Sequence, residues 1–132
     1  MWPIFSIRLG VNVLEKFKKF KFTKSDRIKS KKGFQLVYSS GRSVVDALSV
    51  IYVLTSNGEK AKIGLAVGKK LGPAVMRNRI KRMMREVFRV RKHELKPGVN
   101  IIWVARKKLV AADYNTYDRV FMRLAKRAGL LN

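Results

Sequence analysis

The segment that most restricts how this chain can fold is residues 74–92, AVMRNRIKRMMREVFRVRK. At 100° per residue it separates an apolar stripe from a cationic face, so it predicts a helix that packs one side against a sheet. The stripe contains Met76, Ile80, Met83, Met84, Val87 and Phe88. The cationic face contains Arg77, Lys81, Arg85, Arg89 and Lys92, with Asn78 and Arg82 beside it. Arg79 lies near Glu86, and the spacing allows an ion pair between them.

The cationic face carries almost a single sign of charge, because Glu86 is the only acid in residues 69–92. Like charges four residues apart, as at Arg77, Lys81 and Arg85, destabilise an isolated helix by roughly 0.2–0.5 kcal/mol per pair. A face that met only solvent would carry mixed signs. Arginine predominates, and a guanidinium can grip a phosphate with two hydrogen bonds or stack on a base. The face therefore predicts contact with nucleic acid, and composition leaves DNA and RNA both open.

The charge of the whole chain favours the same partner. Of 132 residues, 31 are Lys or Arg and 8 are Asp or Glu, which gives a formal net charge of +23. Such a charge destabilises a compact domain by self-repulsion and is typical of proteins that bind a polyanion. Hydrophobic residues make up 47% of the chain, enough for one domain with its own core. Nucleic acid is the first candidate partner, and an anionic membrane surface is the second.

The residue types that carry enzyme chemistry are scarce. The chain has no cysteine and a single histidine, His93, which excludes thiol catalysis, disulfides and the common zinc sites. Its 8 acids are scattered, so the sequence contains no recognisable carboxylate cluster for two-metal catalysis. No apolar run is long enough to span a membrane, and residues 1–14 lack the features of a secretory signal. We therefore expect a cytoplasmic protein with no catalytic residue, no metal site, no small-molecule substrate and no membrane contact.

The N-terminal part divides into an extension and the start of a domain. Residues 1–22, which end in EKFKKFKF, form a basic and apolar extension before a single domain at 23–132. The extension is an arm that touches RNA or lipid, a poorly ordered segment, or the product of a start codon placed too far upstream. Residues 30–41 predict a short helix with Ser30 as its N-cap and Gly41 just past its end.

The middle of the chain is rich in β-forming residues. Residues 47–55 and 62–68 predict strands, and Asn57-Gly58 between them predicts a hairpin that pairs the two strands antiparallel. Residues 42–46 can add a short strand before them.

The remaining elements set the fold class. A further strand is predicted at 100–106, and a closing helix at 116–128 has its apolar residues on one face. The order helix, strands, helix, strand, helix is typical of an α+β sandwich with helices packed against a sheet.

Three aromatic residues, Phe34, Tyr38 and Tyr52, allow two interpretations. Aromatic residues at helical spacing usually belong to the core. A tyrosine also carries a polar end, and exposed rings beside a sheet can stack single-stranded bases. Their spacing alone favours the core.

Residues 69–89, KKLGPAVMRNRIKRMMREVFR, resemble the signature of the bacterial ribonuclease P protein subunit, in which an Arg-Asn-Arg core follows a Lys-Lys-x-Gly turn. RIKSKKGFQLVYSSGRSV, SVIYVL, KIGLAVGKK and GVNIIWVARK resemble the family's first helix and its strands, in the same order. The likeness covers about residues 25–128 of the chain. Gly68 stands where the family commonly has serine, and Pro73 where it often has asparagine.

The resemblance implies an α-β-β-β-α-β-α sandwich with a left-handed βαβ crossover, like a ribosomal-protein domain, although crossovers generally prefer the opposite hand. The implied partners are a catalytic RNA subunit and the precursor tRNA whose 5′ leader that RNA removes, with magnesium ions bound mainly through RNA. The RNA subunit would meet Lys69, Lys70, Arg77, Asn78, Arg79, Lys81, Arg82, Arg85 and Arg89. The leader would meet Phe34, Tyr38, Tyr52 and Val67, with Lys29, Lys31 and Arg42 at the rim. The aromatics would then line a cleft instead of the core.

Other classes of protein remain open on the residues alone. A ribosomal or other structural RNA-binding protein would have a similar size, charge and fold. A helix-turn-helix DNA-binding protein would need a tight helical partner before the basic helix, where the pattern predicts strands. A membrane-surface role fits residues 1–22 only, and a protein-only nuclease lacks its acidic cluster. The sequence does not indicate the oligomeric state.

Overall fold

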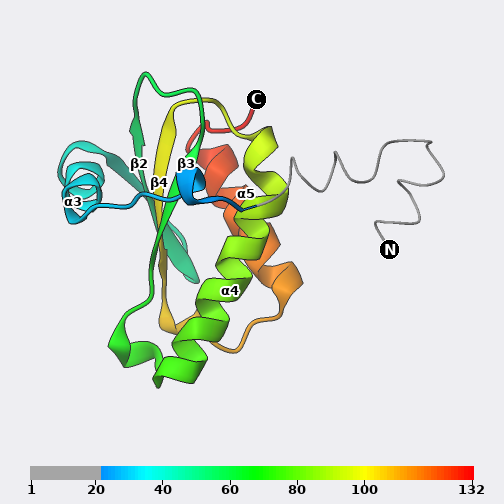
Figure 1. The fold of residues 1–132 in the computed structure, drawn as a ribbon. Coiled ribbons are helices and arrows are strands. Elements are labelled where there is room, and N and C mark those ends of the chain that lie inside the picture. The colour runs from blue at the N-terminus through cyan, green and yellow to red at the C-terminus, as the bar shows by residue number, and fades with distance from the viewer. Residues whose placement is uncertain (1–21) are drawn as a thin grey trace.

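The computed structural model describes residues 22–132, and these form a four-stranded sheet covered by helices on both faces (Figure 1). The elements are α3 (Lys31–Ser40), β1 (Arg42–Val45), β2 (Ser49–Thr55), β3 (Lys62–Ala66), α4 (Ala74–Arg91), β4 (Val99–Ala105) and α5 (Tyr114–Arg127). Short 3-10 turns are η1 (Lys24–Asp26), η2 (Lys69–Leu71), η3 (Lys92–Glu94) and η4 (Lys107–Leu109). The predicted α-β-β-β-α-β-α order is confirmed. Except for Phe22, the predicted N-terminal extension lies outside the described residues.

Local capping explains where α3 begins and ends. The Ser30 hydroxyl accepts a hydrogen bond from the Gly33 backbone N–H at 2.9 Å, which satisfies one of the free donors of the first turn. Gly41 follows the last turn, as predicted, but its backbone is extended and not left-handed. A glycine is required there because a Cβ would lie 2.6 Å from the carbonyl oxygen of Val53 in β2.

The sheet has the order β1-β2-β4-β3, so the predicted hairpin between residues 47–55 and 62–68 is wrong. β4 lies between these two strands, antiparallel to β2 and parallel to β3. Most of its residues are buried, including the adjacent Ile102 and Trp103 on opposite faces, and a strand buried on both faces belongs at the centre of a sheet. The loop after β2 instead packs on the turn before β4, where the Ser56 N–H donates to the Gly98 carbonyl at 2.7 Å.

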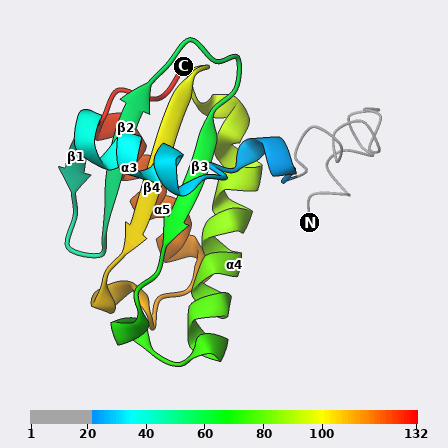
Figure 2. The same cartoon turned by 60° about the vertical axis from the view of Figure 1, so that its left-hand side comes forward.

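The connection from β3 through α4 to β4 has the less common hand. β3 and β4 are parallel neighbours, with Ile63 opposite Ile101 and Leu65 opposite Trp103. α4 crosses between them on the face that α5 also covers, while α3 crosses the opposite face (Figure 2). Viewed along the strands, this path is a left-handed βαβ crossover, against the general preference. The crossover implied by the family resemblance is therefore confirmed.

The main core lies between the sheet and the pair α4–α5. Ile80, Met84, Val87 and Phe88 of the predicted apolar stripe are buried, while Met76 and Met83 are partly buried against the same cluster. The fully buried Trp103 packs against the ring of Phe121 at 4.8 Å between centroids. Its indole N–H donates to the buried Ser49 hydroxyl at 2.9 Å.

The residues before α3 cover the exposed edge of β3. The Ile28 N–H donates to the Ile63 carbonyl at 3.0 Å, so an edge strand gains a backbone partner. The Asp26 carboxylate is fully buried and forms ion pairs with Lys60 at 3.1 Å and Lys92 at 2.8 Å. Phe22 packs edge-on against Phe88 of α4, with ring centroids 6.0 Å apart. Among residues 22–132, no helix is long and apolar enough to cross a membrane.

Candidate nucleic-acid interface

The outward side of α4 carries the predicted cations, and we call the residues Arg77, Asn78, Lys81, Arg82, Arg85 and Arg89 the α4 basic face. Asn78 and Arg82 are exposed on the side of the helix opposite its buried stripe. The expected pair between Arg79 and Glu86 does not form. Glu86 instead accepts a hydrogen bond from Arg89 Nε at 3.0 Å, and this bond holds the pKa of Glu86 below its usual value.

The start of α4 is anchored by the turn before it. Arg77 Nε donates to the Gly72 carbonyl at 3.1 Å, and Gly72 has a φ of 143°, in a region that disfavours side chains. Lys69 and Lys70 in η2 are exposed beside this turn. The turn therefore presents two lysines at the end of the α4 basic face.

The three predicted aromatics form one group on the opposite face of the sheet, and we call Phe34, Tyr38 and Tyr52 the aromatic cleft. The rings of Tyr38 and Tyr52 meet edge-on at 4.8 Å between centroids, and those of Phe34 and Tyr38 lie 6.5 Å apart. Tyr38 is 41% exposed, and Phe34 and Tyr52 are partly exposed. Burial of one side of Tyr38, with a smaller contribution from Tyr52, raises the pKa of its hydroxyl. These rings lie outside the main core, so the interpretation from spacing alone was wrong.

A glycine in β3, Gly64, leaves the space that the Phe34 ring occupies. In the sheet, Tyr52 lies opposite Ile102, and Ile102 lies opposite Gly64. A Cβ at Gly64 would overlap the Phe34 ring, meeting Cζ most closely and lying 2.9 Å from Cε1. The ring therefore rests directly on the β3 backbone. Glycine in a strand interior often marks such a close approach, which is the feature that reveals this contact in the sequence.

The structure brings part of the α4 basic face next to the aromatic cleft. A pocket of about 170 Å³ is lined by Phe34 and Gly64 from the cleft and by Lys81 and Arg85 from α4. Arg27 lines the same pocket and places its guanidinium 5.7 Å from the centre of the Phe22 ring. Sequence reasoning missed Arg27. Two of the predicted RNA-subunit residues, Lys81 and Arg85, and one predicted leader residue, Phe34, thus line the same pocket.

Four of the predicted leader residues have different surroundings. Arg42 pairs in register with Val53 and donates to the carbonyl of Ala128, so its side chain lies on the α5 face and not in the cleft. Val67 packs against the main core. Lys29 lines another pocket, of about 410 Å³, which lies between α3 and the sheet residues Leu54 and Asn100, and Lys31 is exposed on the first turn of α3.

Three further residues, which were not predicted from the sequence, lie on the same face of the sheet as the aromatic cleft. Val50, Val104 and Ala66 are aligned across β2, β4 and β3 and are all partly exposed. They share the side of the sheet on which Tyr52, Ile102 and Gly64 lie, because side chains alternate along a strand. The alternation of side chains along β2 and β4 predicts which residues share this face, but only once the order of the strands in the sheet is known.

Most carboxylates of the described residues are occupied by cations within the protein. Ion pairs involve Asp26, Asp46, Glu86, Glu94 and Asp118. No group of three or more His, Asp or Glu residues in the described part of the chain could hold a metal ion. The many cations beyond these pairs keep their charge uncompensated, which suits a polyanionic partner.

These features define a class of small α+β proteins. Its members have a left-handed crossover, a cationic crossover helix and an adjoining aromatic cleft. The family model for Ribonuclease P matches residues 22–129. The chain belongs to the family of the ribonuclease P protein component, which is part of an endoribonuclease ribonucleoprotein that processes tRNA.

Relatives and solved structures agree with this assignment. The ribonuclease P protein component of Thermoanaerobacter sp. (strain X514) is 38% identical over 104 residues, covering 79% of this chain and 90% of the relative. The RNase P protein of Staphylococcus aureus has a solved structure with a TM-score of 0.76 and 34% identity, covering 83% of this chain and 100% of that one. The Thermotoga maritima RNase P protein, in complex with 1-(4-fluorophenyl)-2-thiourea, has a TM-score of 0.72 and 30% identity, covering 76% of this chain and 98% of that one.

Proposed function

We propose that this chain, through its domain at 23–132, binds the catalytic RNA of ribonuclease P along the α4 basic face and the 5′ leader of precursor tRNA in the aromatic cleft. The proposal rests on the pocket in which Lys81 and Arg85 meet Phe34 and Gly64. That junction joins a surface suited to phosphates to one suited to stacked bases. A single RNA strand can therefore follow the protein from one surface to the other without leaving it.

The two surfaces use different physical interactions. The α4 basic face neutralises closely spaced phosphates, so binding releases counterions and weakens as salt rises. It also lowers the magnesium concentration that the RNA needs to stay folded, with the magnesium ions held mainly by the RNA itself. The aromatic cleft offers ring faces to unpaired bases, and stacking accepts many sequences because every base has a π-face.

We also propose a division of roles between the RNA and the protein. The described residues offer cations, rings and backbone groups, and we assign the cleavage chemistry to the RNA subunit. The protein then improves cleavage by holding the leader, which favours precursor tRNA over mature tRNA, because mature tRNA has no leader. We propose that this assembly works in the cytoplasm.

Cleavage of a precursor tRNA at low magnesium, with a bacterial ribonuclease P RNA, tests the proposal. We expect strong stimulation when the protein is added with the RNA, and no cleavage by the protein alone. Tight RNA binding without stimulation would instead indicate a structural RNA-binding protein of the ribosomal type.

Two variants separate the proposed surfaces. Arg82→Ala removes an exposed cation, so we expect weaker binding of the RNA subunit and a salt slope smaller by about 0.9. Phe34→Ala removes a stacking ring, so precursor binding should weaken by about tenfold, within the range of roughly 1–3 kcal/mol per stacked base. Mature tRNA is the control ligand for Phe34→Ala. Equal losses for both variants in both assays would contradict the division of labour.

A further inference from the structure

The outer side of α5 carries a second set of cations, and we call Arg119, Arg123, Lys126 and Arg127 the α5 basic face. All four are exposed and lie opposite the buried side of the helix. The two acids of this region point elsewhere. Asp118 forms an ion pair with Arg91 of α4 at 2.8 Å, and Asp113 caps the start of α5 by accepting from the Thr116 N–H at 2.9 Å.

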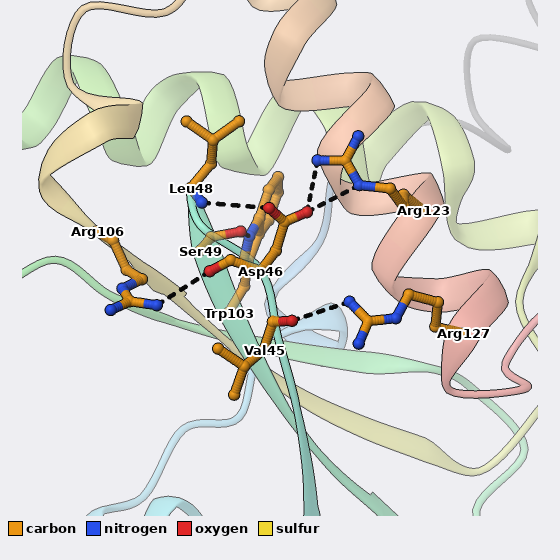
Figure 3. A network of polar contacts seen from close by, with 8 residues as sticks. All are labelled: Val45, Asp46, Leu48, Ser49, Trp103, Arg106, Arg123 and Arg127. Atoms are coloured by element: carbon orange, nitrogen blue, oxygen red, sulfur yellow. Dashed lines mark hydrogen bonds and ion pairs between the residues drawn. The ribbon is translucent and has the colours of Figure 1, made fainter.

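Neighbouring arginines are held in place by backbone carbonyls at the turn between β1 and β2 (Figure 3). Arg127 Nη1 donates to the Val45 carbonyl at 2.8 Å, and Arg106 Nη1 donates to the Asp46 carbonyl at 3.1 Å. A carbonyl is neutral, so these bonds fix each guanidinium without cancelling its charge. Each guanidinium also has further N–H donors for an external acceptor. Fixed side chains lose less conformational entropy when they bind.

Arg123 has a different role in the same group. It donates through Nε to the Asp46 carboxylate at 2.8 Å, and its second nitrogen contacts the same oxygen (Figure 3). Burial by itself raises the pKa of Asp46, but the bond from Arg123, together with the charge of Arg123 and backbone hydrogen bonds such as that from Leu48, holds the pKa below its usual value. This pair ties α5 to the β1–β2 turn and leaves Arg119, Lys126 and Arg127 as the cations without a carboxylate in their hydrogen bonds.

The chemistry of this face selects among anionic partners. The large apolar residues exposed in the described chain are Leu36, Tyr38, Val45 and Val75, and none of them belongs to α5. Within α5 no large apolar side chain or ring is fully exposed, although the exposed Val45 lies beside the helix, where its carbonyl accepts from Arg127. The α5 basic face therefore offers mainly charge and N–H donors, which suit phosphates better than membrane insertion or base stacking. Arg119 and Lys126, two of the cations left without a carboxylate, are seven residues apart, so about 10 Å of helix axis separates them.

From this arrangement we propose that the α5 basic face binds the phosphate backbone of base-paired RNA, as a second RNA-binding surface of the protein. It lies across the sheet from the aromatic cleft, since α3 and α5 cover opposite faces (Figure 1). Paired RNA can therefore occupy it while a single strand occupies the cleft. The phosphates can come from the RNA subunit or from the paired body of a tRNA, and this surface goes beyond the proposed leader and α4 contacts.

The test compares three full-length proteins that differ in where two charges are removed. The first carries Arg119→Gln and Lys126→Gln on the α5 basic face. The matched control carries Lys24→Gln and Lys96→Gln, two exposed lysines outside both basic faces. The unmodified chain is the third. Each is titrated from low to high salt with a blunt RNA duplex, ribonuclease P RNA and a mature tRNA.

For the α5 variant we expect the plot of log K against log salt to become less steep with the blunt duplex. The magnitude of its negative slope should decrease by about 1.8, because each phosphate that is no longer neutralised reduces that magnitude by about 0.9. The control should keep the slope of the unmodified chain, and unchanged thermal midpoints would show that all three proteins are folded. A matching fall with ribonuclease P RNA, or with tRNA, identifies the source of the phosphates. If the α5 variant matches the control with all three RNAs, the surface does not bind RNA. Precursor cleavage by the unmodified protein is a separate assay, so failure of this proposal is distinguishable from failure of the proposed function.

Discussion

Replacing Gly64 with alanine tests the contact that shapes the aromatic cleft. The added Cβ would lie 2.9 and 3.0 Å from two ring carbons of Phe34 and closer still to Cζ. Non-bonded carbon atoms prefer separations of about 3.5–4.0 Å, so the ring must move or the strand must shift. The rest of the glycine's surroundings are expected to tolerate a methyl group, because the three nearest atoms all belong to this one side chain.

The magnitude follows from two opposing effects. Overpacking of this kind costs about 1–3 kcal/mol, while replacing glycine in a strand recovers roughly 0.5–1 kcal/mol of backbone entropy. Gly64→Ala should therefore destabilise the protein by about 1–2 kcal/mol. When Phe34 is already alanine the clash disappears, so the same change should become neutral or slightly stabilising. The interaction energy between the two positions is then about 2 kcal/mol.

Urea unfolding of the four proteins of this double-mutant cycle measures the interaction energy directly. One kcal/mol corresponds to about 4 °C in the midpoint of a domain near this size, so thermal scans provide a second measure. Gly68→Ala is the matched control, because a Cβ at Gly68 meets no atom within 4 Å. Additivity within about 0.5 kcal/mol would refute the contact between Phe34 and Gly64. A displaced ring should also weaken precursor binding while leaving affinity for the RNA subunit intact.

Two further changes test the buried polar groups. Burial by itself raises the pKa of Asp26, but hydrogen bonds led by that from Lys92 and including Lys60 hold the pKa below its usual value. The carboxylate therefore stabilises the fold above the unfolded pKa of about 3.9, and this contribution is lost as pH falls through the lower folded pKa. Asp26→Asn should cost about 3 kcal/mol at pH 7, and urea titrations should show the difference shrinking below about pH 4; a constant difference would contradict the ion pairs. Ser49→Ala leaves the buried indole N–H of Trp103 without its acceptor, so unfolding should become easier by about 1–3 kcal/mol. Adding Trp103→Phe to a protein that already carries Ser49→Ala should then cost less than Trp103→Phe alone, and equal costs would argue against that bond.

The cationic character of the protein has an energetic consequence for its stability. Ion pairs within the protein, such as those of Arg91 with Glu94 and Asp118, neutralise part of its positive charge. The hydrogen bonds that Arg91 donates to Asp118, which have the larger effect, and to Glu94 raise the pKa of Arg91 above its usual value. The remaining cations repel one another until a polyanion binds. We therefore expect bound RNA to relieve this repulsion and to raise the free energy of unfolding of the protein.

Features that depend on near neighbours along the chain could be predicted from the amino-acid sequence alone. The apolar stripe of α4 follows from helical period, and Ser30 as the N-cap of α3 follows from the chemistry of a free backbone N–H. The cationic face follows from the same period, so the residues of α4 expected to meet RNA lie together on one side, with the exception of Arg79. These patterns repeat every few residues, and each is fixed by geometry within a turn or two.

Features that depend on residues far apart in the sequence could be identified only from the tertiary structure. The hairpin suggested by Asn57-Gly58 does not form, because β4 gains more by being buried on both faces than β2 and β3 gain by pairing with each other. The same strand order places Gly64 beneath Phe34 and turns Arg42 toward the end of α5. The left-handed crossover likewise reflects which face of the sheet α4 shares with α5. Such outcomes compare the free energies of whole arrangements, and no local pattern contains that comparison.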